Sequence, residues 1–163
     1  MFHHLLLPID GSAVSDRAAR RGIDFARSTG AEVTLLHVTR VFRPSEVHAH
    51  AVMREAREAE VSARQDAHKV LDPLARAARA EHVACTAIHR VSDKPWEAIV
   101  ALAAEQGCDL IAMASHGHTG VRALVLGSTT NRVVAHAPVP VLVWREPQTV
   151  GQRRHRDSPP GAE

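Results

Sequence analysis

The residues best suited to chemistry lie in the second half of the chain, where glycines and hydroxyl side chains follow an apolar run. Leu110–Ala114 is that run, and Gly117, Gly120 and Gly127 punctuate the segment between it and Ser128. The run predicts a buried strand, and the hydroxyl residues from Ser128 onward predict a helix with a hydroxyl N-cap. Glycines let a backbone approach a ligand closely, and the first N–H groups of a helix have no intrahelical partner. This order of strand, glycine loop and helix N-terminus predicts an anion site, with phosphate as its natural occupant.

An acidic group follows the first apolar run of the chain. His4–Ile9 is typical of a strand, and Asp10, Gly11 and Ser12 after it predict a tight turn, with Ser12 or Ser15 capping a helix. In parallel α/β sheets, ligands bind beyond the carboxyl ends of strands, where the strand order reverses. If the first and fourth strands flank that point, Asp10 faces the glycine loop, where a carboxylate suits a ribose hydroxyl. The residues alone therefore predict a nucleotide-like ligand.

The remaining elements alternate between apolar runs and amphipathic segments. We expect strands over 4–9, 33–38, 83–91, 110–114 and 139–144. We expect a first helix ending near Thr29, a second over about Glu46–Glu81, a third that begins on a Ser92–Asp93 cap before Pro95, and a fourth from Ser128 to about His136. Pro73 either begins a new helix or kinks the long one. This order predicts an α/β fold with a five-stranded parallel sheet and right-handed crossovers.

Composition and charge exclude several classes of protein. The chain has 163 residues, which favours one domain, and a net charge of +2, which is too small to indicate a nucleic-acid binder. No apolar stretch is long enough to span a bilayer, and the first residues lack the layout of a signal peptide, so we expect a cytoplasmic protein. Residues 1–146 carry the periodic pattern of a domain, whereas residues 147–163 are polar without a period and predict a flexible C-terminal tail.

The sequence contains twelve histidines, but few of them lie close together along the chain. Cys85 and Cys108 are the two cysteines and lie far apart, which favours neither a disulfide framework nor a zinc ribbon. The close histidine pairs, which have no cysteine nearby, are His3-His4, His48-x-His50 and His116-x-His118. We therefore expect no metal site.

Four motifs together resemble the universal stress protein family, and the resemblance covers roughly Phe2 to Arg145. These motifs are Pro8-Ile9-Asp10-Gly11-Ser12, the Leu-Leu-His-Val of 35–38, the Ala-Pro-Val-Pro-Val-Leu-Val of 137–143, and the glycine signature Gly-x2-Gly-x9-Gly-Ser. Gly117, Gly127 and Ser128 match that signature, whereas Ala114 stands where its first glycine is expected. An added methyl matters there only if the backbone needs a positive φ or touches the ligand.

The resemblance implies a Rossmann-like fold, which is an open five-stranded parallel sheet with strand order 3-2-1-4-5 and helices on both faces. In one branch of the family it also implies ATP in the crevice described above. The positions that would bind the nucleotide are Pro8, Ile9, Asp10, Val38, Met113, Ala114, Ser115, His116, Gly117, Gly127, Ser128, Thr129 and Thr130. Ile9, Asp10 and Val38 would contact adenine and ribose, and the residues after them in the list would line the ribose and phosphates. ADP or AMP are alternative ligands, and Mg²⁺ is a potential companion.

The resemblance also implies a homodimer. The last strand, Val139–Trp144, would leave a bare apolar edge, which pairing with a second copy would cover. We expect a stress-response sensor or regulatory module rather than a dedicated enzyme, since no general base is evident and any ATP hydrolysis would be slow. No catalytic residue is therefore assigned.

Two alternatives remain open at this point. Another branch of the family lacks the glycine signature and binds no ATP, so a nucleotide-independent dimer acting on unidentified protein partners is one. The other is a weak ATPase or autophosphorylating protein in which Ser128 receives the phosphoryl group. Phosphorylation of Asp10 is disfavoured because the fold that does this needs a late lysine, and no lysine follows Lys94.

Overall fold

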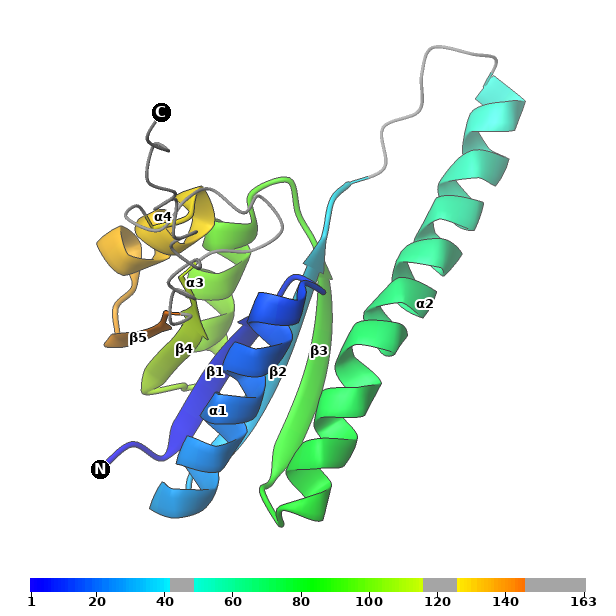
Figure 1. Ribbon diagram of the computed structural model, residues 1–163. Coiled ribbons are helices and arrows are strands. Elements are labelled where there is room, and N and C mark those ends of the chain that lie inside the picture. Colours follow the sequence, from blue (N-terminus) through cyan, green and yellow to red (C-terminus); the bar gives the residue numbers. More distant parts are fainter. Residues whose placement is uncertain (42–48, 116–125, 146–163) are drawn as a thin grey trace, which may run out of the picture.

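Five parallel strands form one sheet at the centre of the protein. The computed structural model describes residues 1–41, 49–115 and 126–145. The strands are β1 (His4–Ile9), β2 (Glu32–Thr39), β3 (Cys85–Val91), β4 (Leu110–Ala114) and β5 (Val141–Trp144). All neighbouring pairs are parallel and the order is β3-β2-β1-β4-β5 (Figure 1). The predicted fold class and strand order are confirmed, and the order reverses between β1 and β4.

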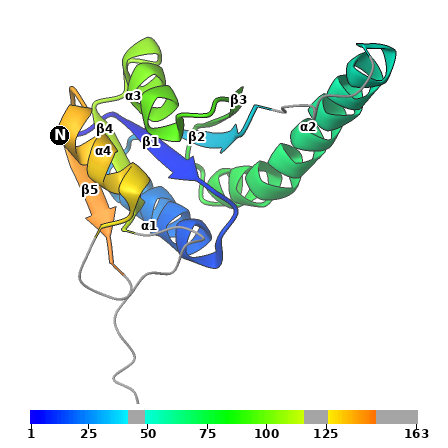
Figure 2. The same cartoon turned by 90° about the horizontal axis from the view of Figure 1, so that it is seen from above.

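Helices cover both faces of the sheet, as Figure 2 shows from above. They are α1 (Ala13–Thr29), α2 (Ala49–Ala80), α3 (Pro95–Glu105) and α4 (Ser128–His136). One apolar core joins the sheet to α1 and α2 through residues such as Leu7, Leu35 and Leu74. A second core joins the opposite face to α3 and α4 through Leu36, Ile99 and others. The central strands are buried on both faces, which explains why β1 and β4 are continuous apolar runs in the sequence.

Helix α1 begins and ends where the sequence predicts. Ser12 is its N-cap, and its Oγ accepts a hydrogen bond from the Ser15 N–H at 3.1 Å. Gly30 follows the helix with φ of 71°, a left-handed conformation that glycine adopts without steric cost, and its N–H bonds to the Ala26 carbonyl. These two ends set the direction in which the chain returns to the sheet.

Helix α2 is one continuous element through Pro73. The helix runs unbroken from Ala49 to Ala80, so Pro73 neither begins a new helix nor ends this one. Buried contacts along the last turns, at Leu71 and Leu74, hold the helix on the sheet and offset the hydrogen bond that proline cannot donate. The expected start at Glu46 lies outside the described residues. The first turns of the helix stand apart from the sheet (Figure 1).

Three other boundaries required correction. Strand β3 begins at Cys85 rather than Val83, because the Val83 N–H bonds to the Ala78 carbonyl and still belongs to the end of α2. Strand β5 begins at Val141 rather than Val139, since Pro140 has no N–H to donate. The N-cap of α3 is Lys94 without a side-chain hydrogen bond, so the predicted Ser92–Asp93 cap is wrong.

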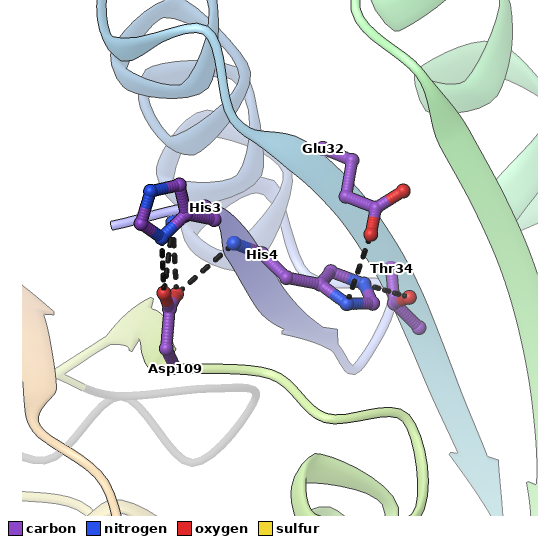
Figure 3. Close-up of polar contacts among 5 residues, drawn as sticks. All are labelled: His3, His4, Glu32, Thr34 and Asp109. Carbon is purple, nitrogen blue, oxygen red and sulfur yellow. Dashed lines mark hydrogen bonds and ion pairs between the residues drawn. The ribbon is translucent and has the colours of Figure 1, made fainter. Parts of the chain in front are cut away.

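A polar cluster lies at the amino edge of the sheet, where the strands begin (Figure 3). Asp109 accepts hydrogen bonds from the backbone N–H groups of His3 at 2.8 Å and His4 at 3.0 Å. The His4 ring contacts Thr34 Oγ1 at 2.8 Å and Glu32 Oε1 at 3.3 Å. Partial burial opposes ionisation of Asp109, but the hydrogen bonds from His4 and His3 outweigh it and lower the pKa of this carboxyl. The cluster ties β1, β2 and β4 together at their first residues.

Candidate functional site

A cleft of about 350 Å³ opens at the carboxyl edge of the sheet, where β1 and β4 diverge. Its lining residues are Pro8, Ile9, Asp10, Ser15, Leu36, Val38, Arg40, Pro95, Ile99, Met113, Ala114, Gly127, Ser128, Thr129 and Thr130. The volume lies within the range of small-molecule sites, roughly 300–1,000 Å³. Its floor is apolar, formed by residues of the second core such as Ile99 and Met113, and polar groups surround its mouth.

Asp10 is held at the mouth of the cleft by the turn that follows β1. Its Oδ1 accepts a hydrogen bond from the Ser12 N–H at 2.9 Å, and Gly11 between them has φ of 84°. Ser15 Oγ accepts from the Asp10 N–H at 3.3 Å and donates to the Ser12 carbonyl at 2.9 Å. The Asp10 side chain is thus a turn former and an exposed acceptor at the same time. The turn fixes a carboxylate beside the point where the strand order reverses.

The N-terminus of α4 faces this carboxylate without a side-chain cap. Gly127 is the N-cap and makes no side-chain hydrogen bond, so the predicted hydroxyl cap is wrong: Ser128 is already the first helical residue. The Gly127 carbonyl accepts from the Asn131 N–H at 2.9 Å, which begins the helical bonding pattern. The N–H groups of the first turn, from Ser128 to Thr130, have no partner within the helix. They and the helix dipole favour an anion at this end of the cleft.

Two hydrogen bonds fasten this helix end to the end of β4. The Gly127 N–H donates to the Ser115 carbonyl at 2.8 Å. Thr130 Oγ1, which is buried, donates to the Ala114 carbonyl at 3.0 Å. The hydroxyl of Thr130 therefore positions the backbone that lines the cleft. The bonds also hold the two ends of the intervening segment together.

Ala114 fits its position without strain. Among the described residues with side chains, only His82 has a positive φ, so the backbone at Ala114 does not require glycine. Ala114 pairs in register with Trp144, whose ring lies 5.9 Å from the Arg21 guanidinium of α1. Since strand side chains alternate between faces, the Ala114 methyl points toward α1, while Met113 points into the second core below the cleft. The departure from the glycine signature leaves the cleft open.

The structure brings together ten of the thirteen residues expected to bind nucleotide; the other three are not among the described lining residues of the cleft. Ser115 is buried behind the lining, where its N–H donates to the Trp144 carbonyl at 2.9 Å. His116 and Gly117 lie outside the described residues, as do His118 and Gly120.

Five lining residues had not been singled out from the sequence: Ser15, Leu36, Arg40, Pro95 and Ile99. Leu36 could have been found, because it lies two residues before Val38 and so shares its face of the strand. Arg40 and Pro95 carry no local signal. They reach the cleft because β2 ends, and α3 begins, at the carboxyl edge of the sheet.

Metal and membrane features were also searched in the residues that the structure describes. None of these residues form a group of three or more His, Cys, Asp or Glu side chains that could hold a metal ion. Among the same residues, the helices are too short or too polar to cross a membrane.

Comparison with known proteins agrees with this geometry. Universal stress protein MJ0531 of Methanocaldococcus jannaschii is 30% identical over 148 residues, covering 91% of this chain and 85% of its own. A universal stress protein of Thermus aquaticus is 34% identical over 150 residues, covering 89% of this chain and 100% of its own. The solved structure of M. jannaschii protein MJ0577 has a TM-score of 0.78 at 28% identity, over 91% of this chain and 99% of that one.

Two more distant structures share the fold and were solved with nucleotides. A universal stress protein in complex with cAMP has a TM-score of 0.61 at 19% identity, covering 88% of this chain and 97% of that one. A family protein of Arabidopsis thaliana with AMP bound has a TM-score of 0.60 at 18% identity, covering 89% and 92%. The family model for universal stress proteins matches residues 1–145. This chain therefore belongs to the universal stress protein family.

Proposed function

We propose that the protein binds an adenine nucleotide in the cleft at the carboxyl edge of the sheet and acts as a nucleotide-responsive regulatory module in the stress response. ATP is the ligand we favour, with ADP and AMP as alternatives. The observation that carries the proposal is that one carboxylate, Asp10, and one helix N-terminus without a side-chain cap, at Gly127, line the same apolar-floored cleft. The cAMP and AMP held by relatives of the same fold support the choice of an adenine nucleotide.

The proposed ligand lies across three strands. The first-turn N–H groups of Ser128, Thr129 and Thr130 would bind phosphate oxygens, because they have no partner within the helix and lie at the positive end of its dipole. Asp10 would accept hydrogen bonds from ribose hydroxyls, and Pro8 and Val38 would contact the base. Mg²⁺ would accompany the phosphates, since Asp10 is the one carboxylate among the described lining residues and Mg²⁺ binds largely through phosphate oxygens and water.

The proposed assembly is a homodimer through β5. This strand is at one edge of the sheet, and its residues Val141–Trp144 are apolar and only half-buried in the single chain. An unpaired apolar edge is a template for another strand, and pairing with a second copy would cover it. We propose the same domain division as before, with residues 1–146 as the family domain and 147–163 as a flexible tail, in a cytoplasmic protein.

Thermal unfolding with and without Mg·ATP tests the binding. Ligand at a hundred times its dissociation constant adds about 2.7 kcal/mol of stability, which for a chain of this size raises the unfolding midpoint by roughly 5–10 °C. Gly127→Val places a branched side chain in the lining, so its midpoint without ligand should stay near wild type while the shift with ATP disappears. Ala104→Val, at an exposed position of α3, is the control and should keep the full shift.

The outcome also separates the alternatives. No midpoint shift in wild type at millimolar ATP would contradict the proposal and favour a module that acts through protein partners. A shift together with phosphate incorporation that Ser128→Ala abolishes would favour autophosphorylation, because the exposed Ser128 lines the cleft.

A further inference from the structure

Among the described residues that line the cleft, Arg40 is the one lysine or arginine. It directly follows Thr39, the last residue of β2, and its side chain is exposed. The other polar lining residues are Asp10 and hydroxyl side chains. A cation that is not needed for the core and lies at a proposed ligand site is a candidate for ligand recognition.

The backbone on both sides of Arg40 is held by the segment that joins β3 to α3. The Ser92 N–H donates to the Thr39 carbonyl at 2.8 Å, and the Val41 N–H donates to Asp93 Oδ1 at 3.3 Å. Thr39 is also held through its hydroxyl, which contacts His89 Nε2 at 2.8 Å. These bonds fix the chain direction at Arg40 before any ligand arrives, and such preorganisation lowers the entropy that binding costs.

The order of the strands places Arg40 at the end of the cleft remote from α4. Strand β2 lies on one side of β1, and β4 with its following helix lies on the other. Two strand spacings amount to about 10 Å, with Asp10 at the end of the strand between them. A nucleotide with its phosphates at the α4 N-terminus therefore carries its base toward Val38 and Arg40.

We propose that Arg40 is a specificity-determining residue that stacks its guanidinium on the base of the bound nucleotide and favours purines over pyrimidines. This inference rests on the proposed nucleotide site. The guanidinium is planar and weakly hydrated, so it stacks on aromatic faces, and a purine offers the larger face. Val38, two residues before Arg40, and Pro95, the first residue of α3, also line the cleft and would exclude water from the stack. A phosphate contact is disfavoured because the helix N-terminus lies at the other end.

Binding of adenosine, ATP and CTP to wild type, Arg40→Ala and Arg40→Lys tests the inference by calorimetry. Arg40→Ala should lower the affinity for adenosine and the affinity for ATP by the same factor, about three- to tenfold. It should also reduce the preference for ATP over CTP. Arg40→Lys should resemble Arg40→Ala, since lysine keeps the charge and loses the planar face. Arg76→Ala, an exposed arginine on α2 outside the lining, is the control and should bind like wild type.

A second variant tests whether the Asp93 bond positions Arg40. Asp93→Ala removes the acceptor of the Val41 N–H. It should weaken adenosine binding when Arg40 is present, but should cause no further loss of affinity in the Arg40→Ala background. Additive losses would contradict the positioning role.

The possible failures are distinguishable. If Arg40→Ala weakens ATP but not adenosine, or if Arg40→Lys restores full affinity, Arg40 contacts phosphate and the stacking inference is overturned. If Arg40→Ala binds every ligand like wild type, this inference fails while the proposed function stands. If the wild type binds no nucleotide, both fail.

Discussion

The hydrogen bond from Thr130 to the end of β4 makes a quantitative prediction. Thr130→Val keeps the shape of the side chain but replaces the hydroxyl that donates to the Ala114 carbonyl at 3.0 Å. Both residues are buried, with 4% of Thr130 and 6% of Ala114 exposed, so water cannot easily replace the lost donor. Leaving a buried carbonyl without its partner costs about 1–3 kcal/mol of unfolding free energy. For a chain of this length, that lowers the thermal midpoint by roughly 2–12 °C.

Urea unfolding of the ligand-free protein, followed by circular dichroism, measures this cost. Thr130→Ser retains the donor and loses only a methyl, so it should lose clearly less stability than Thr130→Val. Thr129→Val, at the half-buried neighbouring position, should change stability by no more than about 0.5 kcal/mol. If Thr130→Val and Thr129→Val prove equally stable, or if the serine variant is the less stable of the Thr130 pair, the hydrogen bond does not fasten α4 to β4 as argued.

Three further predictions concern other parts of the fold. In urea unfolding at pH 7, Asp109→Asn should destabilise the protein by about 1 kcal/mol. This is the cost expected when charged hydrogen bonds are weakened at a partly exposed site. Because the folded-state pKa of Asp109 is lowered, its contribution to stability is fully present above the ordinary aspartate pKa and is lost as the pH falls through the folded value. Wild type and variant should therefore converge in stability once the pH is below the folded pKa, and a difference independent of pH would refute the assignment. Gly22→Ala should also destabilise the protein by roughly 1 kcal/mol in thermal unfolding, because the new Cβ would lie 2.5 Å from Leu7 Cδ2. The cost of this overpacking exceeds the gain in helix propensity. In the Leu7→Ala background, which removes the clash, the same change should be neutral or stabilising. Val143→Lys should convert the proposed dimer to monomer in sedimentation velocity, whereas Val134→Lys, on an exposed helix position, should not; a dimer that survives Val143→Lys would exclude the β5 interface.

The fold was predictable because its strongest signals are local. Each buried strand is an apolar run bounded by a turn or a glycine, and Ser12 and Gly30 are the kinds of residue that begin and end a helix. The alternation of strands and helices leaves few topologies, and the family motifs identify one of them. The strand order followed from these features before any contact was known.

Other features depend on contacts between distant segments. The methyl of Ala114 could be assigned to the α1 face only through its register with Trp144 and the position of Arg21. Arg40 lines the cleft because Ser92 and Asp93 hold the end of β2, and those residues resemble a helix cap in sequence. The hydroxyl-cap prediction failed by one residue, since Gly127 and Ser128 are both acceptable N-caps and local preference does not distinguish them.

The central claim is that a nucleotide binds with its phosphates at α4 and its base toward β2. The most direct test is an NMR titration of the labelled protein with Mg·ATP, adenosine and inorganic phosphate. The account predicts that ATP saturably shifts the backbone amides of Ser128–Thr130 and of Val38, that phosphate moves only the α4 set, and that adenosine moves chiefly Val38 and Asp10. Amides that stay unchanged at millimolar ATP, or shifts confined to residues outside the cleft, would contradict it.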